Sequence, residues 1–407
     1  MLVLKDGIVL TPTSELRGVA VAIEDEHIAE LAPIEELRIP PDATVISVNG
    51  AYIAPGFIDI HVNGGGGADA WHCTDRPDAL ETMCRTHARY GTTSLVPTLI
   101  TAPLDTITAA VRVIAEARGQ ETGGADILGA HVEGPFISPG QKGAHNEQYI
   151  RSPATTDWSE LGELSEAISI MTVAPELAGS CEMANVLASQ GVVFSVGHSD
   201  AKLPDMKRAV DHGFSLVTHI FCSTPGYTRD IANARKISGV MESALILDEL
   251  RVEIIGDGKH VPEGLTRLAL KAKGLQGVCV VTDAINATGM GPGRYRLGDM
   301  DIVVEDNVAK LLDRSFFAGS VATMDLCVRS MVELGDLSIR EAVQTATSIP
   351  AAIIGEQHRK GRIAPGLDGD VVVLDRDVNV LGTIVRGRPV YLDTERLSVR
   401  SPDKETM

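Results

Sequence analysis

The chain has 407 residues, and its 36 Lys and Arg stand against 55 Asp and Glu, so the formal net charge is −19. A chain with this negative net charge is repelled by a polyanion, which excludes nucleic acid as its main partner. The length suits one large barrel or two domains, and the aromatic content of only 4% favours an α/β protein with buried aliphatic strands.

The six cysteines stand at positions 73, 84, 181, 222, 279 and 327, with no Cys-x-x-Cys pair among them. This spacing predicts reduced thiols of an intracellular protein rather than a disulfide framework. The first residues, MLVLKDGIVLTP, have no basic segment followed by an apolar run, and no apolar run of the chain approaches 18 residues. We therefore expect a cytoplasmic protein with no membrane partner.

Both ends of the chain are rich in short strands. Residues 1–54 contain β-branched runs separated by Asp-Gly and polar turns, which indicate antiparallel strands, and residues 369–392 repeat this pattern. We predict one small β-sandwich domain built from residues 1–54 together with 356–395. Residues 396–407 are predicted to form a flexible tail.

The long middle of the chain, residues 55–355, alternates strands with helices. Its apolar runs include ILGAHVEG, ISIMTVAPE, VVFSVGHSD, SLVTHIF, RVEIIGDG and GVCVVTDA, with helix-like stretches between them. A strand followed by a helix, repeated about eight times, predicts a parallel sheet that closes into a (β/α)8 barrel of the TIM type. The predicted fold class is therefore α/β.

Five apolar runs end in an ionisable side chain, namely His61, Glu133, His198, His219 and Asp283. Because a (β/α)8 barrel carries its active site at the carboxyl ends of its strands, we expect these side chains to converge. A single histidine at such a place is more often a hydrogen-bonded structural residue. A buried cluster of carboxylates and imidazoles, however, needs a compensating charge, and a metal cation is the simplest one.

The residues Glu133, His198 and His219 offer one carboxylate oxygen and two imidazole nitrogens. This set suits one Zn²⁺ or a similar divalent ion, such as Fe²⁺, Mn²⁺ or Co²⁺, and leaves a position open for water. Such an ion lowers the pKa of bound water to about 7. Asp283 is then the natural general base for hydrolysis.

The segments PGFIDIHVNG, HVEGPFI, KGAH, TVAPE, VGHSDA, THIF, VTDA and FAGS together resemble the N-acetylglucosamine-6-phosphate deacetylase family of the amidohydrolase superfamily. The resemblance extends over nearly the whole chain. It implies a metal-dependent barrel enzyme that converts N-acetylglucosamine 6-phosphate to glucosamine 6-phosphate and acetate. It also implies a homodimer, because relatives can take a phosphate-binding arginine from the neighbouring subunit.

The resemblance also implies roles for single residues. Glu133, His198 and His219 match the metal ligands of the family, and Asp283 matches its catalytic aspartate. His145 matches the histidine that contacts the substrate carbonyl, which makes it both catalytic and substrate-binding.

Two further residues are expected to bind substrate. His260, in GDGKHVP, falls where the family has a substrate-binding histidine. Phe317, in FAGS, falls where the family lines the acyl pocket, although packing is a rival explanation for it.

Three positions depart from the family pattern. His61 and Asn63 stand where members with two metals have His-x-His, and because Asn is a poor transition-metal ligand we expect at most a weak second site at His61. Cys222 and Ser223 replace an Asn-Ala pair that helps to bind substrate, so we expect both of them to contact the substrate, although a thiol donates hydrogen bonds poorly. The phosphate-binding arginine has only an approximate match in Arg229, with Arg235 and Lys236 nearby.

Because of these departures, the sequence does not determine which amino sugar is the substrate. Glucosamine, galactosamine or mannosamine, N-acetylated and with or without the phosphate, all stay candidates, as does a different N-acyl amide. Many relatives that cleave other amides use a carboxylated lysine on the fourth strand, and ISIMTVAPE contains none. A non-catalytic sugar-phosphate binding protein would be expected to have lost Asp283 or a metal ligand, and all of them are present.

Overall fold

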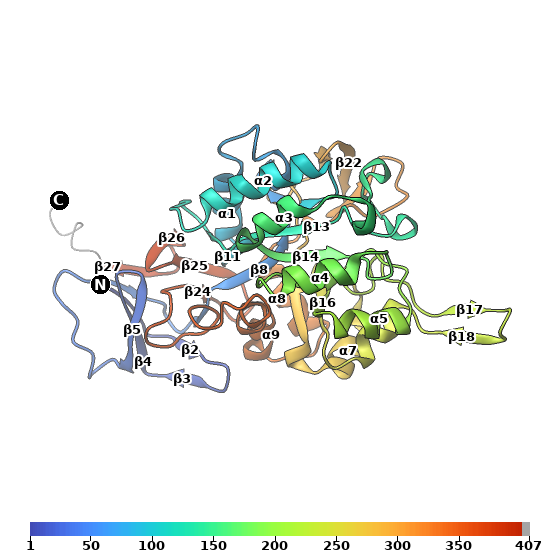
Figure 1. The fold of residues 1–407 in the computed structure, drawn as a ribbon. Coiled ribbons are helices and arrows are strands. Elements are labelled where there is room, and N and C mark those ends of the chain that lie inside the picture. Colours follow the sequence, from blue (N-terminus) through green and yellow to red (C-terminus); the bar gives the residue numbers. More distant parts are fainter. Residues whose placement is uncertain (401–407) are drawn as a thin grey trace.

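The computed structural model describes residues 1–400. Two mixed sheets at one end of the molecule are built from both ends of the chain (Figure 1), with the strand orders β27-β6-β1-β4-β5 and β26-β25-β24-β7-β2-β3. Their strands are β1 (Leu2–Lys5), β2 (Ile8–Leu10), β3 (Glu15–Arg17), β4 (Val19–Glu24), β5 (His27–Pro33), β6 (Thr44–Ser47), β7 (Tyr52–Pro55), β24 (Val371–Leu374), β25 (Val380–Val385), β26 (Arg388–Leu392) and β27 (Ser398–Arg400).

The two sheets share one apolar core. Leu4, Ile23 and Ile46 from the first sheet pack in the same buried cluster as Ile53 and Val373 from the second. Strands from the N-terminal run lie in both sheets, and residues near the C-terminus, such as Val373, complete the same core. This confirms the predicted small β domain built from both termini, while its boundaries at residues 54/55 and 355/356 stay predictions.

Two features of this domain differ from the prediction. β1 pairs with β6, and β2 with β7, in parallel, although the sequence indicated antiparallel strands. The turn at Asp6 and Gly7 joins strands of different sheets, so each strand takes a partner from farther along the chain. Residues 398–400 form β27 against β6, with Leu397 buried, where a flexible tail was predicted from residue 396. The rest of that predicted tail, residues 401–407, lies outside the described residues.

Within residues 1–400, eight parallel strands form the barrel in the order β8-β11-β13-β14-β15-β16-β19-β20, which confirms the predicted (β/α)8 fold. They are β8 (Phe57–Val62), β11 (Thr92–Ile100), β13 (Ala130–Glu133), β14 (Ile168–Val173), β15 (Val193–Val196), β16 (Phe214–Val217), β19 (Arg251–Ile255) and β20 (Val278–Val281), with the short β12 (Asp126–Ile127) also paired to β11.

The first and last barrel strands meet just beyond their carboxyl ends. The Asp283 N–H donates to the His61 carbonyl oxygen at 2.9 Å, and the Asn63 N–H donates to the Ala284 carbonyl oxygen at 2.7 Å. These bonds close the barrel at the end where active sites of this fold lie. Two of the predicted site residues, His61 and Asp283, are thereby held next to each other.

Helices cover the outside of the barrel (Figure 1). In α2, for example, Ile107, Val111 and Ile114 recur at helical spacing and are buried against the strands. The helices are α1 (Ala79–Ala88), α2 (Leu104–Ala117), α3 (Ser159–Glu163), α4 (Ser180–Ala188), α5 (Leu203–Asp211), α6 (Val240–Ile246), α7 (Glu263–Lys273), α8 (Met324–Glu333), α9 (Ile339–Thr345) and α10 (Ser348–Ile353), with 3-10 turns η1 (Ala70–His72), η2 (Pro139–Gln141), η3 (Glu147–Tyr149), η4 (Pro153–Thr155), η5 (Ser165–Ala167) and η6 (Leu275–Gly277).

Three small β elements interrupt the strand-helix alternation. They are the pair β9 (Gly64–Gly65) and β10 (Ala68–Asp69), the hairpin β17 (Thr228–Asp230) and β18 (Arg235–Ile237), and the sheet β21 (Gly293–Leu297), β22 (Met300–Glu305) and β23 (Val308–Leu311). The β17–β18 hairpin projects away from the barrel (Figure 1). Among the described residues, no helix combines the length and the apolar character needed to span a bilayer.

Candidate metal centre and active site

Four predicted site residues meet at the carboxyl ends of the barrel strands. Glu133 is the last residue of β13, and His198, His219 and Asp283 each follow a strand end by two positions. The latter three have positive φ angles of 47°, 29° and 48°. This left-handed conformation is uncommon outside glycine. The chain therefore turns sharply after each strand, and the three side chains line one pocket together with Glu133.

The side chains of Glu133, His198 and His219 face one another through three donor atoms. Glu133 Oε1 lies 3.1 Å from His198 Nε2 and 3.0 Å from His219 Nε2, and the two nitrogens are 3.2 Å apart. Ligands bound tetrahedrally at about 2.0 Å from a zinc ion stand about 3.3 Å from each other. The spacing of these donors therefore fits one small divalent cation.

A hydrogen bond fixes the tautomer of one of these histidines. His198 Nδ1–H donates to the Gln141 carbonyl oxygen at 2.8 Å, so Nε2 is the ring nitrogen that faces Glu133. Burial by itself raises the pKa of Glu133, but the charge of His61 and the hydrogen bonds of the histidines outweigh it and hold that pKa well below its usual value. Glu133 is therefore anionic.

Asp283 lies beside this donor set and is held by an amide. Asn63 Nδ2–H donates to Asp283 Oδ1 at 2.7 Å. From the sequence, Asn63 was considered only as a possible metal ligand. In the structure it is instead a hydrogen-bond donor to Asp283. Burial raises the pKa of Asp283 above the usual value of an aspartate. A carboxylate with a raised pKa is better suited to take up and return a proton near neutral pH.

His145 is oriented by Thr101, a residue that the sequence analysis missed. The Thr101 backbone N–H and hydroxyl lie 3.3 Å and 2.7 Å from His145 Nδ1, so this nitrogen accepts and Nε2 carries the proton. Burial lowers the pKa of His145 to about 3, and the ring is therefore neutral. Its Nε2 lies 3.8 Å from Glu133 Oε2, which aims an N–H donor at the metal site.

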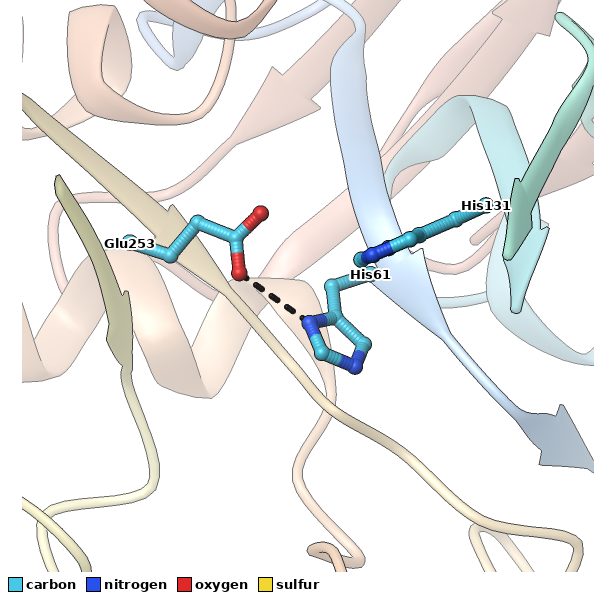
Figure 2. A group of neighbouring side chains, drawn as sticks. All are labelled: His61, His131 and Glu253. Atoms are coloured by element: carbon cyan, nitrogen blue, oxygen red, sulfur yellow. Dashed lines mark hydrogen bonds and ion pairs between the residues drawn. The ribbon is translucent and has the colours of Figure 1, made fainter. Parts of the chain in front are cut away.

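A second buried group lies deeper in the barrel, and Figure 2 shows its members His61, His131 and Glu253. His61 Nδ1–H donates to Glu253 Oε2 at 3.0 Å. His131 Nδ1–H donates to the Ile60 carbonyl oxygen at 3.2 Å, and its Nε2 accepts from the Thr172 hydroxyl at 2.7 Å. Because both ring nitrogens of His131 are engaged, this group supports the side chain of His61 and is not a separate metal site.

The free nitrogen of His61 faces the first cluster. His61 Nε2 lies 3.5 Å from Glu133 Oε2 and 3.4 Å from Asp283 Oδ1. This places His61 at the edge of the donor set, where the sequence analysis had expected at most a weak second site.

The other predicted substrate residues line the same pocket, a cavity of about 260 Å³. His145, Cys222, Ser223, His260 and Phe317 all lie in its wall. His260 Nδ1–H donates to Asp257 Oδ2 at 2.7 Å, and its ring meets the Phe317 ring edge-on with centroids 4.8 Å apart. Burial raises the pKa of the Cys222 thiol to about 12, so this side chain is neutral.

Arg229, by contrast, does not reach the pocket. It lies on the exposed β17 strand, opposite Lys236 in the projecting hairpin (Figure 1). Among the described residues that line the pocket there is no Lys or Arg. The hairpin lies between β16 and α6, and its direction cannot be inferred from spacing along the chain. A phosphate in this pocket would therefore need a cation from elsewhere.

Comparison with known proteins gives the same assignment over most of the chain. Residues 52–390 match the family model described as the amidohydrolase family. N-acetylglucosamine-6-phosphate deacetylase of Danio rerio is 36% identical over 83% of this chain and 84% of the relative, and N-acetylgalactosamine-6-phosphate deacetylase of Escherichia coli O157:H7 is 31% identical over 95% and 98%.

A solved structure is similar over nearly the full length. It is a mutant of N-acetyl-D-glucosamine-6-phosphate deacetylase from Mycobacterium smegmatis in complex with N-acetyl-D-glucosamine-6-phosphate, with a TM-score of 0.83, 30% identity and coverage of 96% of this chain and 98% of that one. The chain therefore belongs to the amidohydrolase family and, within it, to the N-acetylglucosamine-6-phosphate deacetylases.

Proposed function

We propose that the enzyme hydrolyses the N-acetyl group of N-acetylglucosamine 6-phosphate, giving glucosamine 6-phosphate and acetate. The observation that carries this proposal is the pocket in which Asp283 lies beside the three converging donors of Glu133, His198 and His219. The N-acetylglucosamine-6-phosphate deacetylases of Danio rerio and Mycobacterium smegmatis support this substrate, because each shares at least 30% of its sequence with this chain over most of the length.

A divalent cation held by Glu133, His198 and His219 would polarise the amide carbonyl and, in the case of Zn²⁺, lower the pKa of a bound water to about 7. We propose Zn²⁺, with Fe²⁺, Mn²⁺ and Co²⁺ as alternatives, because one oxygen and two imidazole nitrogens suit these ions. The donor spacing of 3.0–3.2 Å supports a single ion at this place.

The remaining steps belong to the side chains around this centre. Asp283 takes a proton from the attacking water and returns it to the departing amine, a role that its raised pKa supports. His145 donates its Nε2–H to the carbonyl oxygen as negative charge develops there. A donor placed in advance for such an oxyanion contributes about 3–4 kcal/mol in other enzymes.

The identity of the sugar is tested by an acetate-release assay. N-acetylated glucosamine, galactosamine and mannosamine are supplied with and without a 6-phosphate, and kcat/KM is compared. We expect the highest value for N-acetylglucosamine 6-phosphate. A higher value for the galactosamine phosphate would favour the second candidate, which the relative from Escherichia coli O157:H7 supports. Hydrolysis of an unrelated N-acyl amide alone would contradict both.

We further propose a cytoplasmic homodimer in which a second copy supplies the cation for the phosphate. Arg229, Arg235 and Lys236 stand on the projecting hairpin, and the described pocket wall has no cation of its own. Light scattering measures the subunit number. The Arg229→Ala variant is expected to raise KM for the phosphorylated sugar and leave KM for the unphosphorylated sugar unchanged. Equal effects on both would refute the role of Arg229.

A further inference from the structure

Glu253 is a fully buried carboxylate in the middle of a barrel strand. It lies on β19 between the buried residues Val252 and Ile254. A buried carboxylate without partners is strongly unfavourable, so its contacts explain why it is tolerated. Glu253 Oε2 accepts from His61 Nδ1–H at 3.0 Å and from the His219 backbone N–H at 3.2 Å.

Both partners of Glu253 belong to the metal centre. His219 supplies a donor atom of the cluster, and His61 stands at its edge. Because Glu253 holds Nδ1–H of His61, Nε2 faces the space between Glu133 and Asp283, at 3.5 Å and 3.4 Å from their oxygens. One carboxylate thus orients a side chain on β8 and anchors the backbone that follows β16.

The opposite side of the His61 ring is closed by His131. The two rings meet edge-on with centroids 4.6 Å apart, and Figure 2 shows His61 between His131 and Glu253. His131 can only pack against His61, since its own nitrogens are engaged. The hydrogen bond that His61 Nδ1–H donates to Glu253 therefore sets the orientation of the His61 ring.

We propose that Glu253 is a positioning residue of the metal centre, which sets the direction of His61 Nε2 and the place of His219. This inference rests on the proposed metal-dependent function. Carboxylates that orient metal-binding histidines in this way typically change metal affinity about 10- to 100-fold when they are removed.

The test compares two variants of similar size. Glu253→Gln keeps one hydrogen-bond acceptor and loses the charge, whereas Glu253→Met removes the acceptor altogether. Competition with a chelator measures the metal dissociation constant of each purified protein. We expect Glu253→Met to weaken metal binding about 10- to 100-fold and Glu253→Gln to weaken it less. At saturating metal we expect kcat to fall and KM for the sugar to stay unchanged.

Asp370→Asn is the matched control, because Asp370 is another buried carboxylate and pairs with Lys360 far from the pocket. We expect this variant to lose thermal stability and to keep the metal affinity of the unmutated chain. Equal metal affinity in Glu253→Met and the unmutated chain would overturn the inference. Absence of metal binding in the unmutated chain would instead refute the proposed function.

The unmutated protein offers a second measurement that does not require either variant to fold. Nitrogen NMR of the chain labelled with ¹⁵N-histidine, with His61 assigned by its loss in His61→Asn, reports which ring nitrogen carries the proton. We expect a proton on Nδ1 of His61, hydrogen-bonded to Glu253. A proton on Nε2 with a bare Nδ1 would overturn the role of Glu253.

Discussion

Asn63 donates a hydrogen bond of 2.7 Å to Asp283, so the residue that stands in place of a second metal-binding histidine holds the carboxylate proposed as the general base. Oδ1 of Asp283 also lies 3.4 Å from His61 Nε2. The first and last strands of the barrel thus meet both through their backbones and through this side-chain contact. The contacts that close the barrel between β8 and β20 therefore also hold Asp283 in place.

The Asn63→Ala variant should lose this orientation of Asp283. A hydrogen bond to a charged group contributes about 1.5–3 kcal/mol, which corresponds to a fall in kcat of about 10- to 100-fold. We expect KM to change little, and steady-state acetate release separates the two constants. Asn146→Ala is the control, since Asn146 bonds to Asp299 outside the pocket and should leave kcat unchanged. Normal kcat in Asn63→Ala would refute the positioning role of Asn63.

The Asp283→Asn variant removes the proton acceptor and keeps the shape of the side chain. We expect acetate release to fall by at least about 100-fold, while elemental analysis finds the same metal content as in the unmutated chain. In the unmutated enzyme, activity should fall as the pH drops through the pKa of Asp283, because the protonated acid cannot accept a proton. Since burial raises that pKa, the acid limb should lie above about pH 3.9.

The His145→Ala variant removes the N–H donor aimed at the carbonyl oxygen. Loss of one such donor costs about 100- to 1000-fold in kcat in a comparable site. Thr101→Val tests how the donor is set up, because it removes the hydroxyl next to His145 Nδ1 and leaves the backbone N–H in place. We expect a smaller fall in kcat than for His145→Ala. An equal fall in both would mean that Thr101 acts on more than His145.

Lys360 links the β domain to the barrel far from the active site, and it is fully buried among Asp126, Asp368 and Asp370 at 3.2, 2.9 and 2.6 Å. Removing one partner of a buried ion pair costs about 3–5 kcal/mol, so Lys360→Met should lower the urea midpoint and leave kcat of the folded protein unchanged. Lys5→Met, at an exposed pair with Asp6, should change stability by no more than about 0.5 kcal/mol.

The stability that Lys360 contributes should depend on pH in a defined way. Its aspartate partners outweigh the effect of burial and raise the pKa of Lys360 above its usual value. The contribution is therefore complete below the unfolded pKa of about 10.4 and is lost as the pH rises through the higher folded pKa. Conversely, Lys360 holds the pKa of Asp368 below its usual value despite burial. The stability that ionised Asp368 contributes is therefore lost only as the pH falls through this lowered pKa. If the difference in urea midpoint between the unmutated protein and Lys360→Met stayed constant up to strongly alkaline pH, this pH dependence would be contradicted.

The sequence was sufficient to predict the site residues that lie at or just after the ends of barrel strands. Glu133, His198, His219 and Asp283 were predicted because the carboxyl ends of parallel strands meet at one mouth, and the structure brings all four together there. The β domain was predicted from a sequence pattern as well, since short β-branched runs separated by turns recur at both ends of the chain.

The supporting residues were missed for physical reasons. Glu253 lies inside an apolar strand, where its charge was the only signal, and its partners are more than thirty residues away along the chain. Thr101 acts through its backbone as well as its hydroxyl, and residue type predicts no such contact. Arg229 was matched by similarity to a phosphate-binding arginine, and it stands on the β17–β18 hairpin outside the pocket of its own chain, a position that depends on three-dimensional packing.

Metal titration of chelator-treated protein tests the central claim most directly. The metal-free chain is titrated with Zn²⁺ while acetate release from N-acetylglucosamine 6-phosphate is followed. We predict no release without metal and full recovery at about one ion per chain, because one carboxylate and two imidazoles form a single closely spaced donor set. Glu133→Gln should bind the ion weakly and recover little. Acetate release that persists in excess chelator would contradict the account.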